Sequence, residues 1–128
     1  MKLRRKLIAD PNLVSCLLKQ RFIFLLVGIF NLQHKTVQGD DVIFEAEVVQ
    51  VFKGDIQNGT IIEINTPSFD GMCGIPYLPL GVDYLLTGRS WRGSYVTYWC
   101  GQVHQGRWKD VPVDIKNALE SGKYEPCT

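Results

Sequence analysis

The stretch that decides the fold is Val-Ile-Phe-Glu-Ala-Glu-Val-Val-Gln-Val-Phe, from Val42 to Phe52. It is rich in β-branched and aromatic residues and partly alternates between apolar and polar positions, which predicts a β-strand. Lys53-Gly54 ends this run, and a second run of the same kind extends from Thr60 to Asn65. Between them, Asn58-Gly59 is a strong turn signal, because both residue types tolerate positive φ. The two runs therefore predict a hairpin with a medium-length loop.

The second half of the chain contains another predicted hairpin, with a connector before it. Asp83 to Thr87 and Tyr95 to Cys100 have strand composition, and Gly88 to Ser94 separates them. Thr66 to Leu80 is interrupted by three prolines and two glycines, so we expect an exposed connector that is anchored at Cys73. Loops of this kind on rigid scaffolds often carry binding residues.

The last predicted element, from Val113 to Ser121, has helical periodicity. Pro112 suits the first turn of a helix, and Gly122 suits its end. Its apolar stripe consists of Ile115, Ala118 and Leu119. Strands at hairpin spacing followed by one short helix predict a small closed β architecture. The five-stranded Greek-key OB-fold barrel is one such architecture.

The N-terminal third allows two interpretations. The nine apolar residues from Phe22 to Phe30 have the length of a signal-peptide core and are too few to cross a bilayer, so we expect no transmembrane segment. The same run fits a strand buried on both faces, because such strands need not alternate. Cleavage after Gly39 would remove Cys16 and any first strand. We therefore expect an atypical segment at residues 1–40 (a tail, a signal-like run or a first strand) and a domain at residues 41–128.

Charge and cysteine content narrow the function classes. The net charge is +1, with 14 basic and 13 acidic residues, so the chain lacks the one-signed field that holds a polyanion, and we expect no nucleic-acid partner. Four cysteines in a short chain favour an oxidising compartment and allow three pairings. His34 and His104 are isolated, and no pair of cysteines or histidines has zinc-site spacing, so we expect no metal site and no cofactor. The serines and carboxylates show no nucleophile and base arrangement, so we expect no catalytic residue and no enzyme.

Five short motifs carry a resemblance to a known family. They are Val51-Phe52-Lys53-Gly54, Thr66-Pro67-Ser68 leading to Cys73-Gly74, Tyr84-Leu85-Leu86-Thr87-Gly88, Tyr98-Trp99-Cys100 and Lys123-Tyr124-Glu125-Pro126-Cys127. In this order they resemble the N-terminal, netrin-like domain of the tissue inhibitors of metalloproteinases, from about Asp41 to Cys127. The resemblance implies a mainly β, five-stranded Greek-key OB-fold barrel with a short C-terminal helix.

The same resemblance implies a function and a location. It implies a secreted protein of the extracellular matrix that binds the active-site cleft of a secreted or matrix metalloproteinase as a wedge. In a secreted chain, Asn58-Gly59-Thr60 is also a candidate site for N-glycosylation at Asn58. The connector residues that the resemblance assigns to contact with the protease are Ser68, Phe69, Asp70, Gly71, Met72 and Cys73.

In the family, the inhibitory surface has two parts, of which the connector is one. The other part is missing from this sequence. In the family, an N-terminal Cys-x-Cys segment chelates the zinc of the protease through its α-amino group and first carbonyl, displacing the zinc-bound water. No Cys-x-Cys segment occurs in this chain, so zinc chelation is in doubt.

The resemblance also bears on the disulfides. It would pair Cys73 and Cys100 with the two missing cysteines and Cys127 with a third early cysteine, for which Cys16 is the candidate. We therefore prefer a bond between Cys16 and Cys127, with Cys73 and Cys100 either free or joined to each other. Alternatively, cleavage between Ser15 and Cys16 would expose an N-terminal cysteine that could chelate zinc, with Cys16 paired to Cys73.

Two function classes follow, and a third is less favoured. The first is the metalloproteinase inhibitor, and the second is a netrin-like extracellular binding module without inhibitory activity, which acts through surface loops. The third is an OB-fold nucleic-acid binder, against which the near-neutral charge argues. Its stacking residues would be Trp91, Tyr95, Tyr98 and Trp99.

Overall fold

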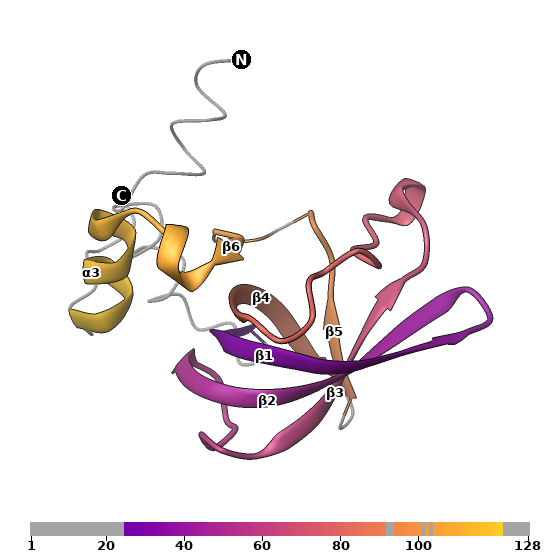
Figure 1. The fold of residues 1–128 in the computed structure, drawn as a ribbon, viewed down its shortest axis with the longest axis horizontal. Helices are drawn as coiled ribbons and strands as arrows, with labels where there is room; N and C mark the ends of the chain where they lie inside the picture. The colour runs from indigo at the N-terminus through magenta and orange to yellow at the C-terminus, as the bar shows by residue number, and fades with distance from the viewer. Residues whose placement is uncertain (1–24, 92–93, 101, 103, 122–128) are drawn as a thin grey trace.

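A computed structural model describes residues 25–91, 94–100, 102 and 104–121 (Figure 1). The strands are β1 (Leu25–Gln38), β2 (Asp41–Lys53), β3 (Ile61–Pro67), β4 (Asp83–Trp91), β5 (Ser94–Thr97) and β6 (Gly106–Arg107). The helices are two single 3-10 turns, η1 (Asp70–Met72) and η2 (Trp108–Asp110), and the α-helix α3 (Val113–Ser121). The mainly β composition and the short helix near the C-terminal end of the described chain confirm the predicted fold class.

Five of these strands close into a barrel. Their hydrogen-bonded order is β1, β2, β3, β5, β4, and a further pairing of β1 with β4 completes the ring. The pairing of β3 with β5 is parallel, and the other pairings in the ring are antiparallel. The short strand β6 pairs with β4 outside the ring. This closed mixed barrel is consistent with an OB-fold-like architecture, and closure leaves the five strands without the long open edge of a flat sheet.

The first predicted hairpin is confirmed as β2 and β3, which pair in antiparallel register from Asp41 opposite Pro67 to Glu47 opposite Ile61. Asn58 and Gly59 form the turn in the loop between these strands, and Gly59 has a φ of +85°. The Asn58 side chain stabilises this loop, because its Oδ1 accepts a hydrogen bond from the Val51 amide at 3.1 Å. The turn signal and the strand signals therefore agree in this part of the chain.

The N-terminal third contributes a full strand to the barrel. Of the two interpretations of the apolar run, the structure has the strand: β1 begins at Leu25 and pairs with β2 on one side and β4 on the other. Leu26, Phe30 and Leu32 lie in the main core, and Val27 lies in a second cluster, which explains why the run does not alternate. The division after residue 40 falls in the turn between β1 and β2, so the barrel includes residues on both sides of it. Residues 1–24 lie outside the described part of the chain.

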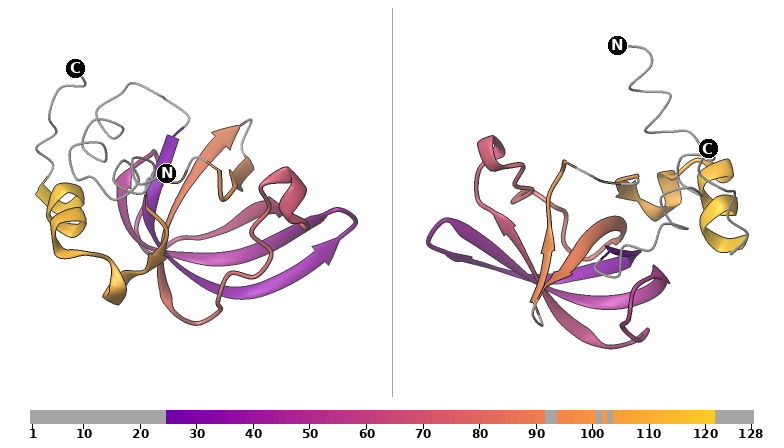
Figure 2. Two further views of the ribbon diagram at one scale, coloured as in Figure 1. Left: turned by 90° about the horizontal axis from the view of Figure 1, so that it is seen from above. Right: turned by 180° about the vertical axis from the view of Figure 1, so that it is seen from behind.

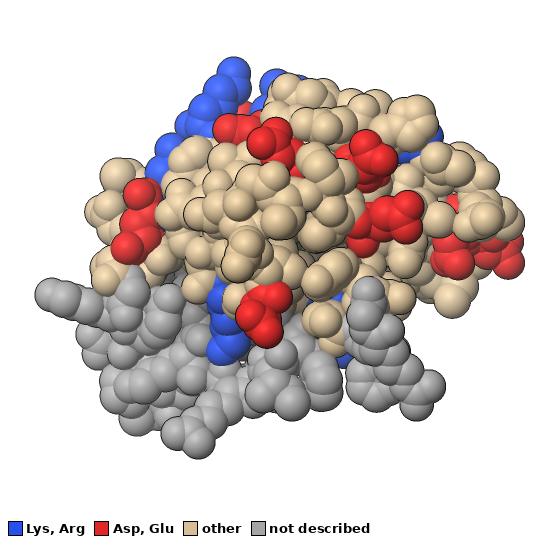
Figure 3. Space-filling view, turned by 90° about the horizontal axis from the view of Figure 1, so that it is seen from below, with Lys and Arg blue, Asp and Glu red and all other residues tan. Residues whose placement is uncertain are grey.

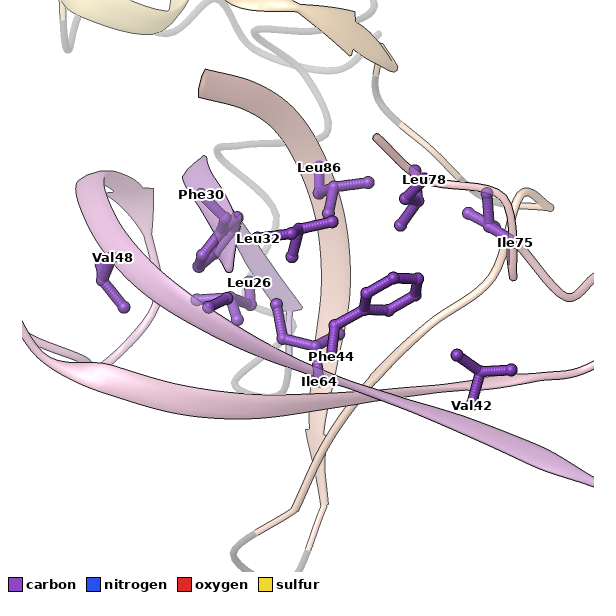
Figure 4. Packing of buried hydrophobic residues seen from close by; sticks show 11 residues of the cluster. Leu26, Phe30, Leu32, Val42, Phe44, Val48, Ile64, Ile75, Leu78 and Leu86 are labelled. Carbon is purple, nitrogen blue, oxygen red and sulfur yellow. The ribbon is translucent and has the colours of Figure 1, made fainter. Parts of the chain in front are cut away.

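Two hydrophobic clusters hold the fold together. The main cluster fills the barrel, and its labelled side chains converge from the strands and the connector (Figure 4). Its buried members are Leu26, Phe30, Leu32, Val42, Phe44, Ala46, Val48, Ile64, Ile75, Leu78 and Leu86. The second cluster joins α3 to the barrel, and its buried members are Val27, Leu85, Val111, Ile115 and Leu119.

The helix prediction is confirmed at both ends of the expected range, Val113–Ser121. Its Ile115 and Leu119 are buried and Ala118 is partly buried, as the apolar stripe predicts. The ribbon views place α3 at one end of the molecule and η1 at the opposite end (Figures 1 and 2). Its buried residues Ile115 and Leu119 pack with Val27 of β1 and Leu85 of β4. Because these two strand residues alternate with the core residues Leu26 and Leu86, the helix lies against the outer side of the barrel wall.

The second hairpin is also confirmed, with shifted boundaries. β4 runs on to Trp91, and β5 ends at Thr97, so Cys100 lies beyond the strand rather than within it. The expectation of an exposed connector from Thr66 to Leu80 is wrong in part, because Ile75 and Leu78 belong to the main core. The prolines and glycines made the segment irregular as predicted, but its two aliphatic side chains still gain free energy from burial.

Candidate functional site

The connector between β3 and β4 is the candidate site, and its first part projects from the barrel. Ser68 follows β3, and its amide donates to the Asp40 carbonyl at 2.8 Å, which ties the connector to the turn between β1 and β2. The single turn η1 then reverses the chain, with the Met72 amide donating to the Phe69 carbonyl at 3.3 Å. The predicted contact residues 68–73 therefore form one compact projection beside a hairpin turn.

Close backbone packing fixes the position of this projection. Gly74 lies against Pro67, and a Cβ atom at residue 74 would be 2.0 Å from the Pro67 carbonyl oxygen. The next amide, of Ile75, donates to Oγ1 of the buried Thr66 at 2.9 Å. Cys73 has a φ of +59° and is the one non-glycine residue with positive φ in the described chain. Only glycine fits at residue 74, and its neighbour adopts a left-handed conformation that costs side-chain-bearing residues free energy.

A disulfide between Cys73 and Cys100 joins the projection to the segment after β5. The two Cα atoms are 5.6 Å apart, and the Trp99 amide donates to the Cys73 carbonyl at 2.8 Å. Of the pairings considered from the sequence, this confirms that Cys73 and Cys100 are joined to each other. It contradicts the pairing of Cys16 with Cys73, because one sulfur cannot hold both partners. Cys16 and Cys127 lie outside the described residues.

Gln102 holds the other side of the disulfide against the barrel. Its Nε2 donates to the carbonyl oxygens of Thr87 and Tyr98, at 2.8 and 2.6 Å, and its Oε1 accepts from the Thr87 amide at 2.8 Å. Buried Thr97 adds a bond from its Oγ1 to the Thr87 carbonyl at 2.8 Å. One glutamine side chain therefore takes the place of strand pairing where β5 has ended.

Three large apolar side chains are exposed around the disulfide. Phe69 is 47% exposed, Met72 is 56% exposed and Trp99 is 50% exposed. We call Phe69, Met72 and Trp99 the apolar patch. Large side chains of this kind, on a rigid support, are characteristic of protein-binding surfaces. These three exposed apolar side chains are suited to bind an apolar surface of a partner.

Trp99 is the member of this patch that the sequence-based list of contact residues missed. The sequence predicted Trp99 to lie within a strand that reached Cys100, but β5 ends two residues before it. The signal that could have found it is its position beside Cys100, which any disulfide to Cys73 would bring near the connector. Asp70 lies in η1, and its side chain is outside the description of the structure.

The aromatic residues considered for nucleic-acid stacking do not share one exposed surface. Tyr95 packs against the main core, Tyr98 is half-buried, and Trp99 is exposed beside the disulfide. Trp91 ends β4, and its side chain lies outside the described part. The described members are therefore split between the core and the surface.

The outer face of β2 and β3 carries mostly acidic charge. Viewed from the side of β2 and β3, acidic side chains are scattered over a largely uncharged surface (Figure 3). Glu45 on β2 lies directly opposite Glu63 on β3, and both are exposed. Like charges in this cross-strand position repel each other, which destabilises the pairing slightly.

Neither histidine forms part of the candidate site. His34 is exposed on β1, opposite Glu45. His104 is half-buried, its Nδ1 has no hydrogen-bond partner among the described residues, and burial lowers the pKa of its imidazole while nearby Asp114 opposes this. Within the residues that the structure describes, no three His, Cys, Asp or Glu side chains come together in a way that could hold a metal ion.

Comparison with protein-family models and with curated proteins finds no match for this chain. Among the described helices, none has the length and apolar character needed to cross a membrane.

Proposed function

We propose that this chain is a secreted inhibitor of an extracellular or matrix metalloproteinase, which inserts the connector from Ser68 to Cys73 into the active-site cleft. The observation that carries this proposal is the apolar patch on a braced projection. Phe69 and Met72 leave the barrel on a turn that a disulfide and close backbone packing hold in place. Because the projection is already ordered, little conformational entropy remains to be lost when it enters a cleft.

The motif resemblance supports the same assignment. Its Thr66-Pro67-Ser68 motif lies at the end of β3, where the projection begins, and its Tyr98-Trp99-Cys100 motif lies at the other end of the disulfide. The two motifs that border the proposed contact surface are therefore adjacent in space, although about thirty residues separate them in sequence. The resemblance also supports secretion, residence in the extracellular matrix and glycosylation at Asn58.

The absence of Cys-x-Cys from the sequence defines how such an inhibitor would act. Without a chelating α-amino group next to a disulfide cysteine, inhibition comes from occupation of the cleft rather than from a bond to the zinc ion of the enzyme. Phe69 and Met72 would fill an apolar subsite, and Trp99 would contact the rim. Burying such anchors accounts for most of the affinity in many protein complexes.

A test of this proposal uses the full chain with its natural mature N-terminus and a purified matrix metalloproteinase. We expect competitive inhibition in the nanomolar range that survives acetylation of the α-amino group. Loss of inhibition on acetylation would show that the inhibitor acts by zinc chelation and not by occupation of the cleft. No inhibition at micromolar concentration would refute the inhibitor assignment for this form of the protein.

Matched serine variants test whether the patch is the contact surface. Phe69→Ser and Trp99→Ser should each weaken inhibition at least about tenfold, which corresponds to about 1.4 kcal/mol. Ile61→Ser is the control, because Ile61 is similarly exposed, at 53%, but lies about 20 Å away at the other end of β3. Equal inhibition by all three variants would place the contact surface elsewhere.

The second candidate is a netrin-like extracellular binding module that lacks inhibitory activity. The missing Cys-x-Cys segment favours it, because the barrel and its projection do not depend on that segment. The same variants distinguish the two candidates. A binding module would bind an extracellular protein in a manner that depends on Phe69 and Trp99 and would leave the metalloproteinase active.

A further inference from the structure

The disulfide between Cys73 and Cys100 joins the two segments that carry the apolar patch, and it has an accessible side. Cys100 is exposed and Cys73 is half-buried, so the bond can be approached from solvent at Cys100. Phe69 and Met72 lie on the Cys73 side of the bond and Trp99 on the Cys100 side. Breaking this bond would therefore divide the patch into two halves.

The backbone on the Cys73 side is held in an unfavourable conformation. Cys73 has a φ of +59°, and the neighbouring Gly74 is pressed against the Pro67 carbonyl. A left-handed conformation at a residue with a side chain persists where surrounding contacts enforce it. Here the contacts are the disulfide on one side and the packing of Gly74 on the other. Disulfides that are exposed and carry strain are reduced more readily than buried structural ones.

Each half of the patch has its own attachment to the barrel. On the connector side, Ile75 and Leu78 are in the main core, and the Ile75 amide is bonded to Thr66. On the other side, Gln102 joins the segment after β5 to Thr87 on β4. Between the halves, the described backbone contributes one hydrogen bond, from Trp99 to Cys73. The barrel therefore has a means to stay folded when the bond opens, while among the described backbone groups only the hydrogen bond from Trp99 to Cys73 would still join the two halves of the patch.

From this geometry we propose that the Cys73–Cys100 disulfide is a reversible redox switch for the apolar patch, opened by a dithiol reductant. A thiolate of the dithiol attacks Sγ of Cys100, forms a mixed disulfide and releases the Cys73 thiolate, which takes up a proton. The second thiol of the dithiol then displaces Cys100 as a thiolate, which is protonated in turn. Two electrons and two protons pass to the protein, and the dithiol becomes a cyclic disulfide.

This switch would regulate the proposed inhibitor. It rests on the proposed function only for the identity of the protein that the patch binds. In the oxidised form, Phe69, Met72 and Trp99 are held together and can bind. In the reduced form, the two halves move independently, and a partner must pay the entropy of ordering them again.

The test is a redox titration of the full-length native chain in buffers with graded ratios of reduced to oxidised dithiothreitol, without denaturant. Exposed thiols are trapped by alkylation and located by peptide mapping, which separates Cys73 and Cys100 from the other two cysteines. We expect Cys73 and Cys100 to become labelled together while the far-UV circular dichroism stays unchanged. Addition of oxidised dithiothreitol should reverse the labelling.

Hydrogen exchange supplies a readout that involves no protease. On reduction, the Met72, Gly74 and Trp99 amides should exchange at least tenfold faster, whereas the Phe44 and Val48 amides of the barrel should not change. If the bond stays closed until denaturant is added, or if labelling coincides with loss of the circular dichroism signal, the disulfide is a structural staple and the proposal is wrong.

Two double variants separate reduction from side effects of the reagent. Cys73→Ser with Cys100→Ser should reproduce the fast exchange of the reduced form. Cys73→Gly with Cys100→Ser should show a smaller increase at Gly74, because glycine accepts the left-handed conformation. Equal increases in the exchange rate of the Gly74 amide in the two variants would show that the left-handed conformation of residue 73 makes no contribution. If the titration succeeds but neither redox form inhibits a metalloproteinase, the switch stands and the inhibitor assignment fails.

Discussion

The barrel core and the apolar patch contain the same kinds of side chain, but the core buries them and the patch exposes them to solvent. Phe30 and Phe44 are almost completely buried between the strands, whereas Phe69 is about half exposed on a projection. Burial of a phenylalanine stabilises a fold by about 1.5 to 3 kcal/mol, and exposure forgoes much of that gain. Folding therefore accounts for the core, whereas binding to a partner would account for the exposed side chains of the patch.

The two regions also differ in what supports them. Strand pairing and side-chain packing hold the core, and these features extend through most of the described chain. The patch depends on one disulfide, one left-handed residue and one glycine that accepts close contact. Changes in the core should therefore lower the stability of the whole protein, while changes to the exposed side chains of the patch should act locally.

The largest effect is expected from removing β1. A chain that begins at Asp40, as cleavage after Gly39 would produce, loses the strand that closes the ring between β2 and β4. It also loses Leu26, Phe30 and Leu32 from the core. We expect no cooperative unfolding transition and poor dispersion of amide signals in NMR spectra. A folded truncated chain would show that β1 is dispensable and would bring back the interpretation of its apolar run as a signal peptide.

Paired phenylalanine variants measure the contrast between core and patch directly. Phe44→Ala should lower the free energy of unfolding by about 3 to 5 kcal/mol, because it leaves a cavity in the main core. Phe69→Ala should change it by less than about 0.5 kcal/mol, as expected for an exposed position. Urea denaturation of the two variants tests this. Similar losses in both would mean that Phe69 packs against the fold more than its exposure indicates.

Two glycines of the connector provide the next test. Gly74→Ala should cost about 1 to 3 kcal/mol, because its Cβ would be 2.0 Å from the Pro67 carbonyl oxygen. Gly71→Ala is the control, since the nearest atom to its Cβ is 3.7 Å away, in the Phe69 ring. Thermal unfolding of both variants gives the comparison. A Gly74 variant as stable as the Gly71 variant would contradict close packing at the base of the projection.

A smaller effect of opposite sign is expected on the acidic outer face. Glu45→Gln removes one of two like charges that face each other across β2 and β3, so it should raise the free energy of unfolding by about 0.2 to 1 kcal/mol. The gain should shrink at high salt, which screens exposed charges. Denaturation at low and high ionic strength checks both points, and a loss of stability at low salt would show that Glu45 has a favourable partner.

The smallest effect concerns pH. Burial lowers the pKa of His104 in the folded state below its ordinary value of 6.5, with Asp114 opposing this shift. The unfolded chain therefore binds the proton more readily than the folded protein does. The stabilising contribution of neutral His104 is complete above pH 6.5 and is lost as the pH falls towards the lower, folded-state pKa. The melting temperature should decline less steeply below pH 6.5 in His104→Gln than in the unaltered protein. Parallel pH profiles for the two proteins would assign that slope to other groups.

The predictable parts of the fold share a strong local signal. The apolar alternation of Val42 to Phe52 predicted β2 almost to its ends, and the stripe of Ile115 and Leu119 predicted α3. The run that contains β1 gave an ambiguous signal, because a strand that contacts two clusters is apolar at consecutive positions and looks like a signal-peptide core. Pairing with β4, more than fifty residues later in the chain, resolves that ambiguity.

The candidate site was half predictable. The connector and Cys73 were predicted from the prolines, glycines and motifs, but the burial of Ile75 and Leu78 and the exposure of Trp99 were not. Irregular segments have no periodicity from which to read a buried face. Which side chains turn inward there depends on the shape of the barrel surface that they meet.

Local sequence signals predict the β-rich class, the first hairpin, the C-terminal helix and a connector anchored at Cys73, because hydrophobic period and turn chemistry act over a few neighbouring residues. Tertiary contacts decide that Cys73 bonds to Cys100, that β1 closes the ring and that exposed Trp99 lies across the disulfide from the segment with Phe69 and Met72. These outcomes depend on contacts between residues far apart in the chain. Such contacts follow from how the strands close on one another, which no local pattern encodes.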